Sequence, residues 1–227
     1  MKKNIRYCAL LWLLVVATSK SQTLPSDFSD VTALTDKVEV QLAYFGSDNF
    51  VGSQIDGYQA NRCYLQTKAA KALAKVAEQA SQQGYLLLLK DCYRPQRAVD
   101  HFMRWAADKA DIKTKNQYYP DLPKSALVGE YIAEKSGHSR GSTLDVSLMQ
   151  RTSDGHWQAL DMGSPYDFFG PISHVNTTQI SQQQQRNRQR LIDLMQAGGF
   201  EVYSQEWWHF SLREPVYTDR YFDFVIE

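Results

Sequence analysis

Apolar residues recur along the chain at two different periods, and the periods predict strands and helices in irregular order. Alternation of apolar and polar residues predicts a strand over residues 38–45. Apolar side chains three to four residues apart predict an amphipathic helix over residues 67–83, which Gly84 would end. The apolar run 86–89 is too short for a helix and predicts a buried strand, and a helix with proline in its first turn is expected over residues 95–109.

The second half of the chain repeats this mixture. Alternation predicts a strand over residues 143–148, and Ser181 is placed to cap a helix that Gly198 would end. Residues 200–203 and 207–212 are expected to form paired final strands. Because helices and strands do not alternate regularly, we expect one α+β domain with a central, mainly antiparallel sheet flanked by helices.

The first residues have the layout of a secretory signal peptide, with a basic start, an apolar core and small polar residues after it. We assign residues 1–21 to this signal and expect cleavage after Ser19 or Ser21. The apolar core, residues 8–17, has about half the roughly 20 residues that a membrane span needs, which argues against an uncleaved anchor. We therefore expect an exported, periplasmic protein with residues 22–227 as its mature domain and no stable membrane span.

Charge and cysteine content narrow the class of this mature domain. Removing the signal takes away four of the 25 basic side chains and none of the 25 acidic ones, which leaves a net charge of −4. A mildly acidic protein is not expected to bind nucleic acid by electrostatic attraction. Cys63 and Cys92 remain, and in an exported protein they are compatible either with a disulfide or with two buried free thiols.

Two histidines and one aspartate are candidate metal ligands. His138, Asp145 and His209 suit a borderline-soft cation such as zinc and leave one coordination position open, as in catalytic sites. Asp145 lies on the polar face of the predicted strand, and Gly141 permits a bend that would bring His138 beside it. From spacing alone, a surface histidine and an unrelated strand carboxylate are the alternative.

Two further charged residues are candidates for chemistry. Glu206, three residues before His209, would supply a general base beside a metal ligand. The two residues face opposite sides of a straight strand, so the pair requires a bulge or a strand that begins after Glu206. Arg94 lies at a strand-to-helix junction, where a functional side chain is common, although an arginine there is more often a surface charge.

The spacing of these residues resembles a known enzyme family. Ser136-x-His138-x-x-Gly141-x-x-x-Asp145 with Glu206-x-x-His209 resembles the signature of zinc D-alanyl-D-alanine peptidases. The resemblance narrows to the D-alanyl-D-alanine dipeptidases, including the vancomycin-resistance type, and runs from about Tyr44 to the C-terminus. Four ordered segments carry it: Asp91-Cys92-Tyr93-Arg94-Pro95-x-Arg97-Ala98, Ser139-Arg140-Gly141-Ser142, Met162-Gly163-Ser164-Pro165-Tyr166-Asp167 and Glu206-Trp207-Trp208-His209.

The resemblance implies a zinc metallopeptidase that hydrolyses D-alanyl-D-alanine to two D-alanines. It implies one zinc ion per chain on one face of the sheet, held by His138, Asp145 and His209. Glu206 would be the general base, and Arg94 would stabilise the negative oxygen that forms during attack on the scissile carbonyl.

The resemblance also implies which residues bind the dipeptide. These are Tyr44, Ser136 and Asp167, with the Asp167 carboxylate facing the free ammonium of the substrate; local composition does not show this. The signal peptide favours turnover or salvage of the dipeptide outside the cytoplasm over antibiotic resistance. Nothing in the residues indicates an oligomeric state.

Two other functions share such a metal site. One is a zinc D,D-carboxypeptidase or endopeptidase that acts on peptidoglycan stem peptides and needs a more open groove. The other is a zinc-containing binding module without turnover, as in hedgehog-type signalling domains with a related site. Such a module is expected to lack the base, whereas Glu206 is present.

Overall fold

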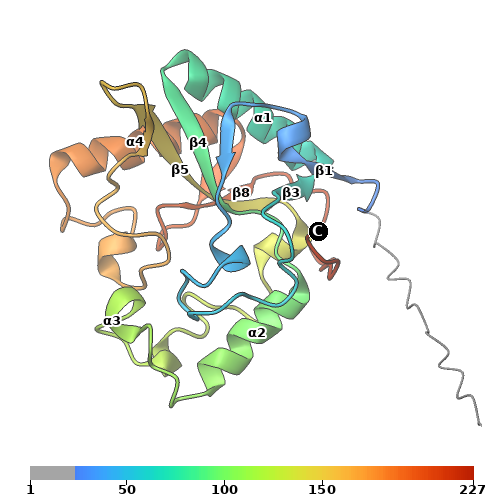
Figure 1. Ribbon diagram of the computed structural model, residues 1–227, viewed down its shortest axis with the longest axis vertical. Helices are drawn as coiled ribbons and strands as arrows, with labels where there is room; N and C mark the ends of the chain where they lie inside the picture. The colour runs from blue at the N-terminus through green and yellow to red at the C-terminus, as the bar shows by residue number, and fades with distance from the viewer. Residues whose placement is uncertain (1–23) are drawn as a thin grey trace, which may run out of the picture.

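A central sheet runs through the molecule, and helices pack against it from one side (Figure 1). The computed structural model describes residues 24–227, so the expected signal peptide lies outside the described residues. The strand order is β2-β4-β5-β8-β7, and β6 pairs with β5. Only β2 and β4 run parallel among these strands; the other pairs are antiparallel, which confirms the predicted α+β class. The strands are β2 (Val38–Val40), β4 (Tyr85–Asp91), β5 (Thr143–Arg151), β6 (Trp157–Ala159), β7 (Phe200–Val202) and β8 (His209–Leu212).

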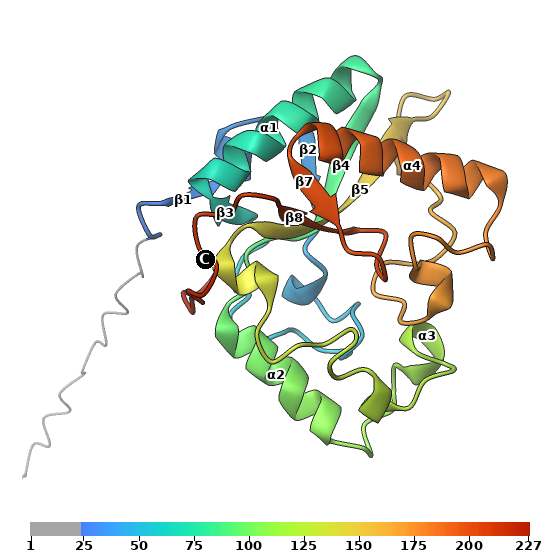
Figure 2. The same ribbon diagram turned by 180° about the vertical axis from the view of Figure 1, so that it is seen from behind.

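Two long helices cover one face of the sheet, as Figure 2 shows from behind. They are α1 (Thr67–Gln82) and α4 (Gln182–Ala197). Ser181 and Gln184 form a capping box at the start of α4, so each satisfies a backbone N–H that the first helical turn leaves unpaired. Apolar side chains of β4 and β5 face these helices and form the main core, which includes Leu87, Leu144 and Val146.

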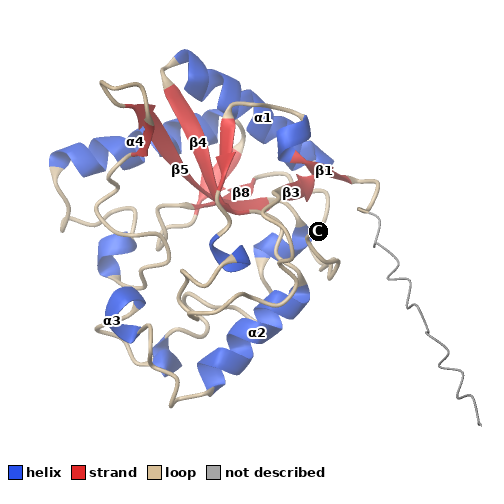
Figure 3. Ribbon diagram, in the orientation of Figure 1, coloured by secondary structure: helices blue, strands red, loops and turns tan. Residues whose placement is uncertain are grey.

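The remaining helices and most of the loops lie at the other end of the sheet (Figure 3). Helices α2 (Gln96–Ala107) and α3 (Lys115–Tyr118) belong to this part, and a small antiparallel sheet of β1 (Phe28–Asp30) and β3 (Tyr64–Gln66) lies beside the main sheet. Five short 3₁₀ helices complete the described residues: η1 (Val31–Ala33), η2 (Ala43–Phe45), η3 (Lys124–Ala126), η4 (Gly137–Arg140) and η5 (Pro171–Ser173). Loops therefore surround the end of the sheet at which β4 leads into α2.

Two predicted strands are shorter in the structure by two or more residues. The strand predicted over residues 38–45 ends at Val40, and Tyr44 lies in η2. Beyond Val40 the Gln41 N–H still donates to the Leu89 carbonyl of β4, and the Leu42 N–H donates to the Asn61 side chain, 2.9 Å away. The strand predicted over residues 207–212 begins only at His209.

A disulfide joins Cys63 to Cys92, with the two Cα atoms 5.3 Å apart. Both cysteines are fully buried, so the bridge is confirmed and the alternative of two free thiols is wrong. The bridge fixes the chain just after β4, next to the residues of the candidate site. Within residues 24–227, no helix combines the length and the apolar character that a membrane crossing requires.

Candidate active site

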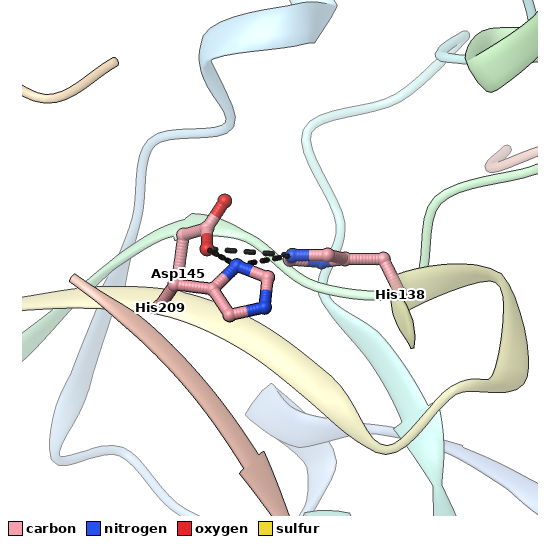
Figure 4. Close-up of side chains that lie close together, drawn as sticks. All are labelled: His138, Asp145 and His209. Atoms are coloured by element: carbon pink, nitrogen blue, oxygen red, sulfur yellow. Dashed lines mark hydrogen bonds and ion pairs between the residues drawn. The ribbon is translucent and has the colours of Figure 1, made fainter. Parts of the chain in front are cut away.

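The three predicted ligands meet at one point, although they come from three separate elements (Figure 4). His138 lies in η4, Asp145 in β5 and His209 at the first position of β8, where it pairs directly with Asp145. Oδ1 of Asp145 is 3.3 Å from Nε2 of His138 and 3.1 Å from Nδ1 of His209, and those two ring nitrogens are 3.3 Å apart. This separation leaves the three atoms close enough to share one ion.

A tight turn brings His138 back over the strand. Gly141 adopts a left-handed conformation, with φ of +79°, at the end of η4, and a Cβ at this position would collide with the ring of Phe28. Nδ1 of His138 is 2.7 Å from the carbonyl oxygen of Cys92. Because a carbonyl only accepts, Nδ1 donates this hydrogen bond, which leaves Nε2 facing Asp145 as the nitrogen available to a metal ion.

The donor set fits a zinc ion. Oδ1 of Asp145 is buried and has no hydrogen-bond partner, which is costly unless a cation balances it. Burial opposes ionisation of Asp145, but the two neighbouring histidines outweigh burial and lower its pKa below the usual range. Two imidazole nitrogens and one carboxylate oxygen make the three-ligand set of catalytic zinc, with a fourth position open.

Glu206 lies beside this group because the final strand begins after it. The backbone turns between Tyr203 and His209: the Glu206 N–H donates to the Tyr203 carbonyl, and the His209 N–H donates to the Glu206 carbonyl, each at 3.2 Å. Oε2 of Glu206 is therefore 3.4 Å from Nδ1 of His209, on the same side of the sheet. Burial raises the pKa of the Glu206 carboxyl well above its usual range; Asp145 adds to the rise and Arg94 opposes it.

Arg94 is held in place by an aspartate that the sequence reasoning did not assign to the site. Nε and one terminal nitrogen of Arg94 each lie 2.9 Å from Oδ2 of Asp91. The other Asp91 oxygen accepts from the Tyr58 hydroxyl at 2.6 Å. This leaves the guanidinium 3.6 Å from Oδ2 of Asp145 and packed over two aromatic rings. An acid three residues before the arginine, at the end of a buried strand, was the available signal.

A small cavity of about 190 Å³ connects these groups. Of the eight predicted site residues, only His138 does not line it, because its ring is fully buried behind the cavity wall. Aromatic side chains and residues 129–137 form much of the remaining wall. The seven predicted residues that line the cavity are Tyr44, Arg94, Ser136, Asp145, Asp167, Glu206 and His209.

The predicted substrate-binding residues occupy this wall. Oδ2 of Asp167 accepts from the Tyr44 hydroxyl at 2.8 Å, and burial raises the pKa of Asp167 well above its usual range, with the charge of Asp145 adding to the rise. A cationic ligand group would offset the cost of ionising this carboxyl. The Ser136 hydroxyl accepts from the His138 N–H at 3.3 Å and caps η4, so this serine also shapes the metal group.

Comparisons with known proteins agree with this geometry. The profile of a peptidase family, M15, described as D-Ala-D-Ala dipeptidase, matches residues 25–227. A D-alanyl-D-alanine dipeptidase of Enterococcus faecium is 44% identical over 181 residues, which cover 79% of this chain and 88% of that protein. A protein of the same description from Streptomyces coelicolor is 39% identical and matches 89% of this chain and 100% of its own length. One from Escherichia coli is 36% identical and matches 87% of this chain and 95% of its own length. The resemblance seen in the four ordered segments is confirmed, and the chain belongs to the D-alanyl-D-alanine dipeptidase family of peptidases.

Proposed function

We propose that this chain is a zinc metallopeptidase that hydrolyses D-alanyl-D-alanine to two D-alanines. The observation that carries the proposal is the pairing of two features in one small cavity. Two of the three metal ligands, Asp145 and His209, line this cavity with His138 behind them, and so does the buried carboxyl of Asp167, which a cation would stabilise. A dipeptide supplies both partners, because the residue that carries its scissile carbonyl also carries its free ammonium.

His138, Asp145 and His209 would hold the zinc ion, which supplies Lewis acidity when bound. Glu206 accepts the proton of the attacking water and passes it to the leaving amine, a role that its position 3.4 Å from Nδ1 of His209 suits. Arg94 faces the oxygen that becomes negative during attack, and its bonds to Asp91 fix its position before charge develops there.

The part of the cavity wall that holds Tyr44, Ser136 and Asp167 selects the substrate. Asp167, with the Tyr44 hydroxyl bonded to it, receives the ammonium, and Ser136 contacts the dipeptide near the metal group. A cavity of about 190 Å³ favours a very short peptide over a stem peptide, which would need an open groove.

The cellular setting is a separate part of the proposal. Residues 1–21 have the layout of a signal peptide, which supports export to the periplasm. There the enzyme would recover D-alanine from dipeptide released during cell-wall turnover. Sequencing the N-terminus of protein isolated from a periplasmic fraction tests this; a full-length chain in the cytoplasm would contradict it.

The activity is tested by measuring release of D-alanine by purified residues 22–227. D-Alanyl-D-alanine should be hydrolysed, a chelator should abolish the hydrolysis, and zinc should restore it. N-acetyl-D-alanyl-D-alanine should be a poor substrate, because its neutral amide leaves the Asp167 carboxylate without a partner, which costs orders of magnitude in kcat/KM. Equal cleavage of both compounds, or efficient cleavage of a stem pentapeptide, would instead indicate a carboxypeptidase.

A further inference from the structure

The two oxygens of Asp145 have different surroundings. Oδ1 faces the ring nitrogens of His138 and His209 and has no hydrogen-bond donor. Oδ2 accepts a hydrogen bond from the Tyr166 hydroxyl at 2.9 Å, and Arg94 approaches it only to 3.6 Å. The carboxylate torsion of aspartate has a broad, nearly two-fold energy profile, so external contacts decide which oxygen faces the ion. Tyr166 makes the shorter of those two contacts.

The hydroxyl proton of Tyr166 has two possible acceptors, and their chemistry decides between them. Its oxygen is 2.9 Å from Oδ2 of Asp145 and 3.3 Å from the Tyr44 hydroxyl oxygen. The Tyr44 hydroxyl itself donates a hydrogen bond to Oδ2 of Asp167, at 2.8 Å. Because the Asp145 oxygen is both closer and part of an ionised group, the Tyr166 proton points to Asp145. The other carboxylate oxygen therefore stays free for an ion.

The backbone around Tyr166 is shaped to make this contact. The next residue, Asp167, is the only non-glycine residue among those described that has a positive φ, at +59°. In extended chain, neighbouring side chains point to opposite sides. The left-handed turn instead lets Tyr166 reach Asp145 while Asp167 reaches Tyr44. The Tyr166 ring packs edge-on against Trp208, with 5.4 Å between ring centroids.

We propose that Tyr166 is a positioning residue of the metal site. Its hydroxyl donates a hydrogen bond to Oδ2 of Asp145, and this contact orients the carboxylate so that only Oδ1 faces the ion. The same hydroxyl places the metal ligand next to the Tyr44–Asp167 pair, so one short chain of contacts sets the position of the ion relative to the substrate ammonium site. The inference rests on the proposed metal ligands.

The test is the zinc dissociation constant of Tyr166→Phe, measured by competition with a chromophoric chelator. This change removes one hydroxyl and keeps the ring against Trp208. Groups that orient metal ligands are typically worth about 10- to 100-fold in metal affinity, so the dissociation constant should rise about tenfold or more. A value within about twofold of wild type, in a folded protein, would overturn the role of Tyr166.

Tyr44→Phe is the matched control, because its hydroxyl is the next in the chain of contacts but touches no proposed ligand. Its zinc dissociation constant should stay within about twofold of wild type, while KM for D-alanyl-D-alanine rises. An equal loss of zinc affinity in both variants would indicate general loosening and overturn the inference. If the wild-type protein bound no zinc, the proposed function itself would fail. If the wild type required zinc and Tyr166→Phe bound zinc as tightly as the wild type, only the inference about Tyr166 would be wrong.

Cobalt substitution supplies a readout that ring packing alone does not change. With the hydroxyl removed, Oδ2 of Asp145 is free to become a further ligand, and a higher coordination number weakens the visible absorption of bound Co²⁺. Tyr166→Phe should therefore absorb less per bound cobalt than wild type and Tyr44→Phe. An unchanged spectrum would contradict the proposal. If Tyr166→Phe did not fold, Tyr166→Met, which also lacks the donor, would be measured in the same way.

Discussion

Replacing Asp91 with asparagine is expected to destabilise the protein strongly, because the change breaks a buried ion pair. Asp91 is completely buried, and the side chain of its partner Arg94 is only 13% exposed. Two Arg94 nitrogens lie 2.9 Å from Oδ2 of Asp91, and the Tyr58 hydroxyl donates to the other oxygen. Burial raises the pKa of Asp91, and the positive charge of Arg94 opposes the rise.

The expected loss in the free energy of unfolding is about 3 to 5 kcal/mol, the usual cost of leaving one member of a buried pair without its partner. Asparagine keeps the size and one acceptor but removes the negative charge that balances Arg94. The nearest other carboxylate, Asp145, is 3.6 Å from the guanidinium and faces the proposed metal. A shift of Arg94 by about 1 Å should lower kcat by up to about 100-fold.

The stability measurement is urea unfolding of the zinc-free protein, followed by tryptophan fluorescence. Asp223→Asn serves as the matched control, because the Arg97–Asp223 pair has the same chemistry but its side chains are 42% and 47% exposed. That variant should lose only about 0.2 to 1 kcal/mol. Equal losses in the two variants would refute the view that Asp91 balances a buried charge. A large loss of stability with wild-type kcat would show that Arg94 is oriented by other contacts.

Three further outcomes are expected. Glu206→Ala should lower kcat by about 100-fold or more while metal analysis still finds one zinc per chain; loss of the metal would instead make Glu206 a ligand. The double change Cys63→Ala and Cys92→Ala should lower the free energy of unfolding in urea by about 3 kcal/mol, from the entropy of a loop spanning 29 residues. Two alkylatable thiols in native wild type would contradict the bridge. Zinc at about 1,000 times its dissociation constant should stabilise wild type by about 4 kcal/mol and Asp145→Asn much less, whereas equal stabilisation would exclude Asp145 as a ligand.

Much of the candidate site could be predicted from residue types and short spacings. His138, Gly141 and Asp145 lie within one turn and the start of one strand, so local backbone preferences already bring them together. The helix cap at Ser181 and the helix end before Gly84 also depend only on neighbouring residues. The helices therefore begin and end near the predicted residues. Family resemblance supplied roles for Tyr44 and other residues that no local pattern indicates.

Alternation alone made two predicted strands too long by two or more residues. Residues 38–45 alternate as a half-buried strand would, yet the strand ends at Val40, the Leu42 N–H donates to the distant Asn61 side chain, and residues 43–45 form η2. The final strand starts at His209 because Trp207 donates its N–H to the Ser173 carbonyl outside the sheet. In both cases a group remote in sequence accepts a backbone N–H just outside the strand.

Only the tertiary structure decided how the distant halves of the site meet. Pairing of β5 with β8 places His209 directly opposite Asp145, and the turn before β8 puts Glu206 on their side of the sheet. The contacts of Asp91 with Tyr58 and of Tyr166 with Asp145 likewise join separate segments. Residue types and local dihedral preferences are properties of short stretches, whereas strand register and buried hydrogen bonds depend on how the whole chain packs. The sequence by itself therefore determined which chemical groups are present, and packing determined which of them touch.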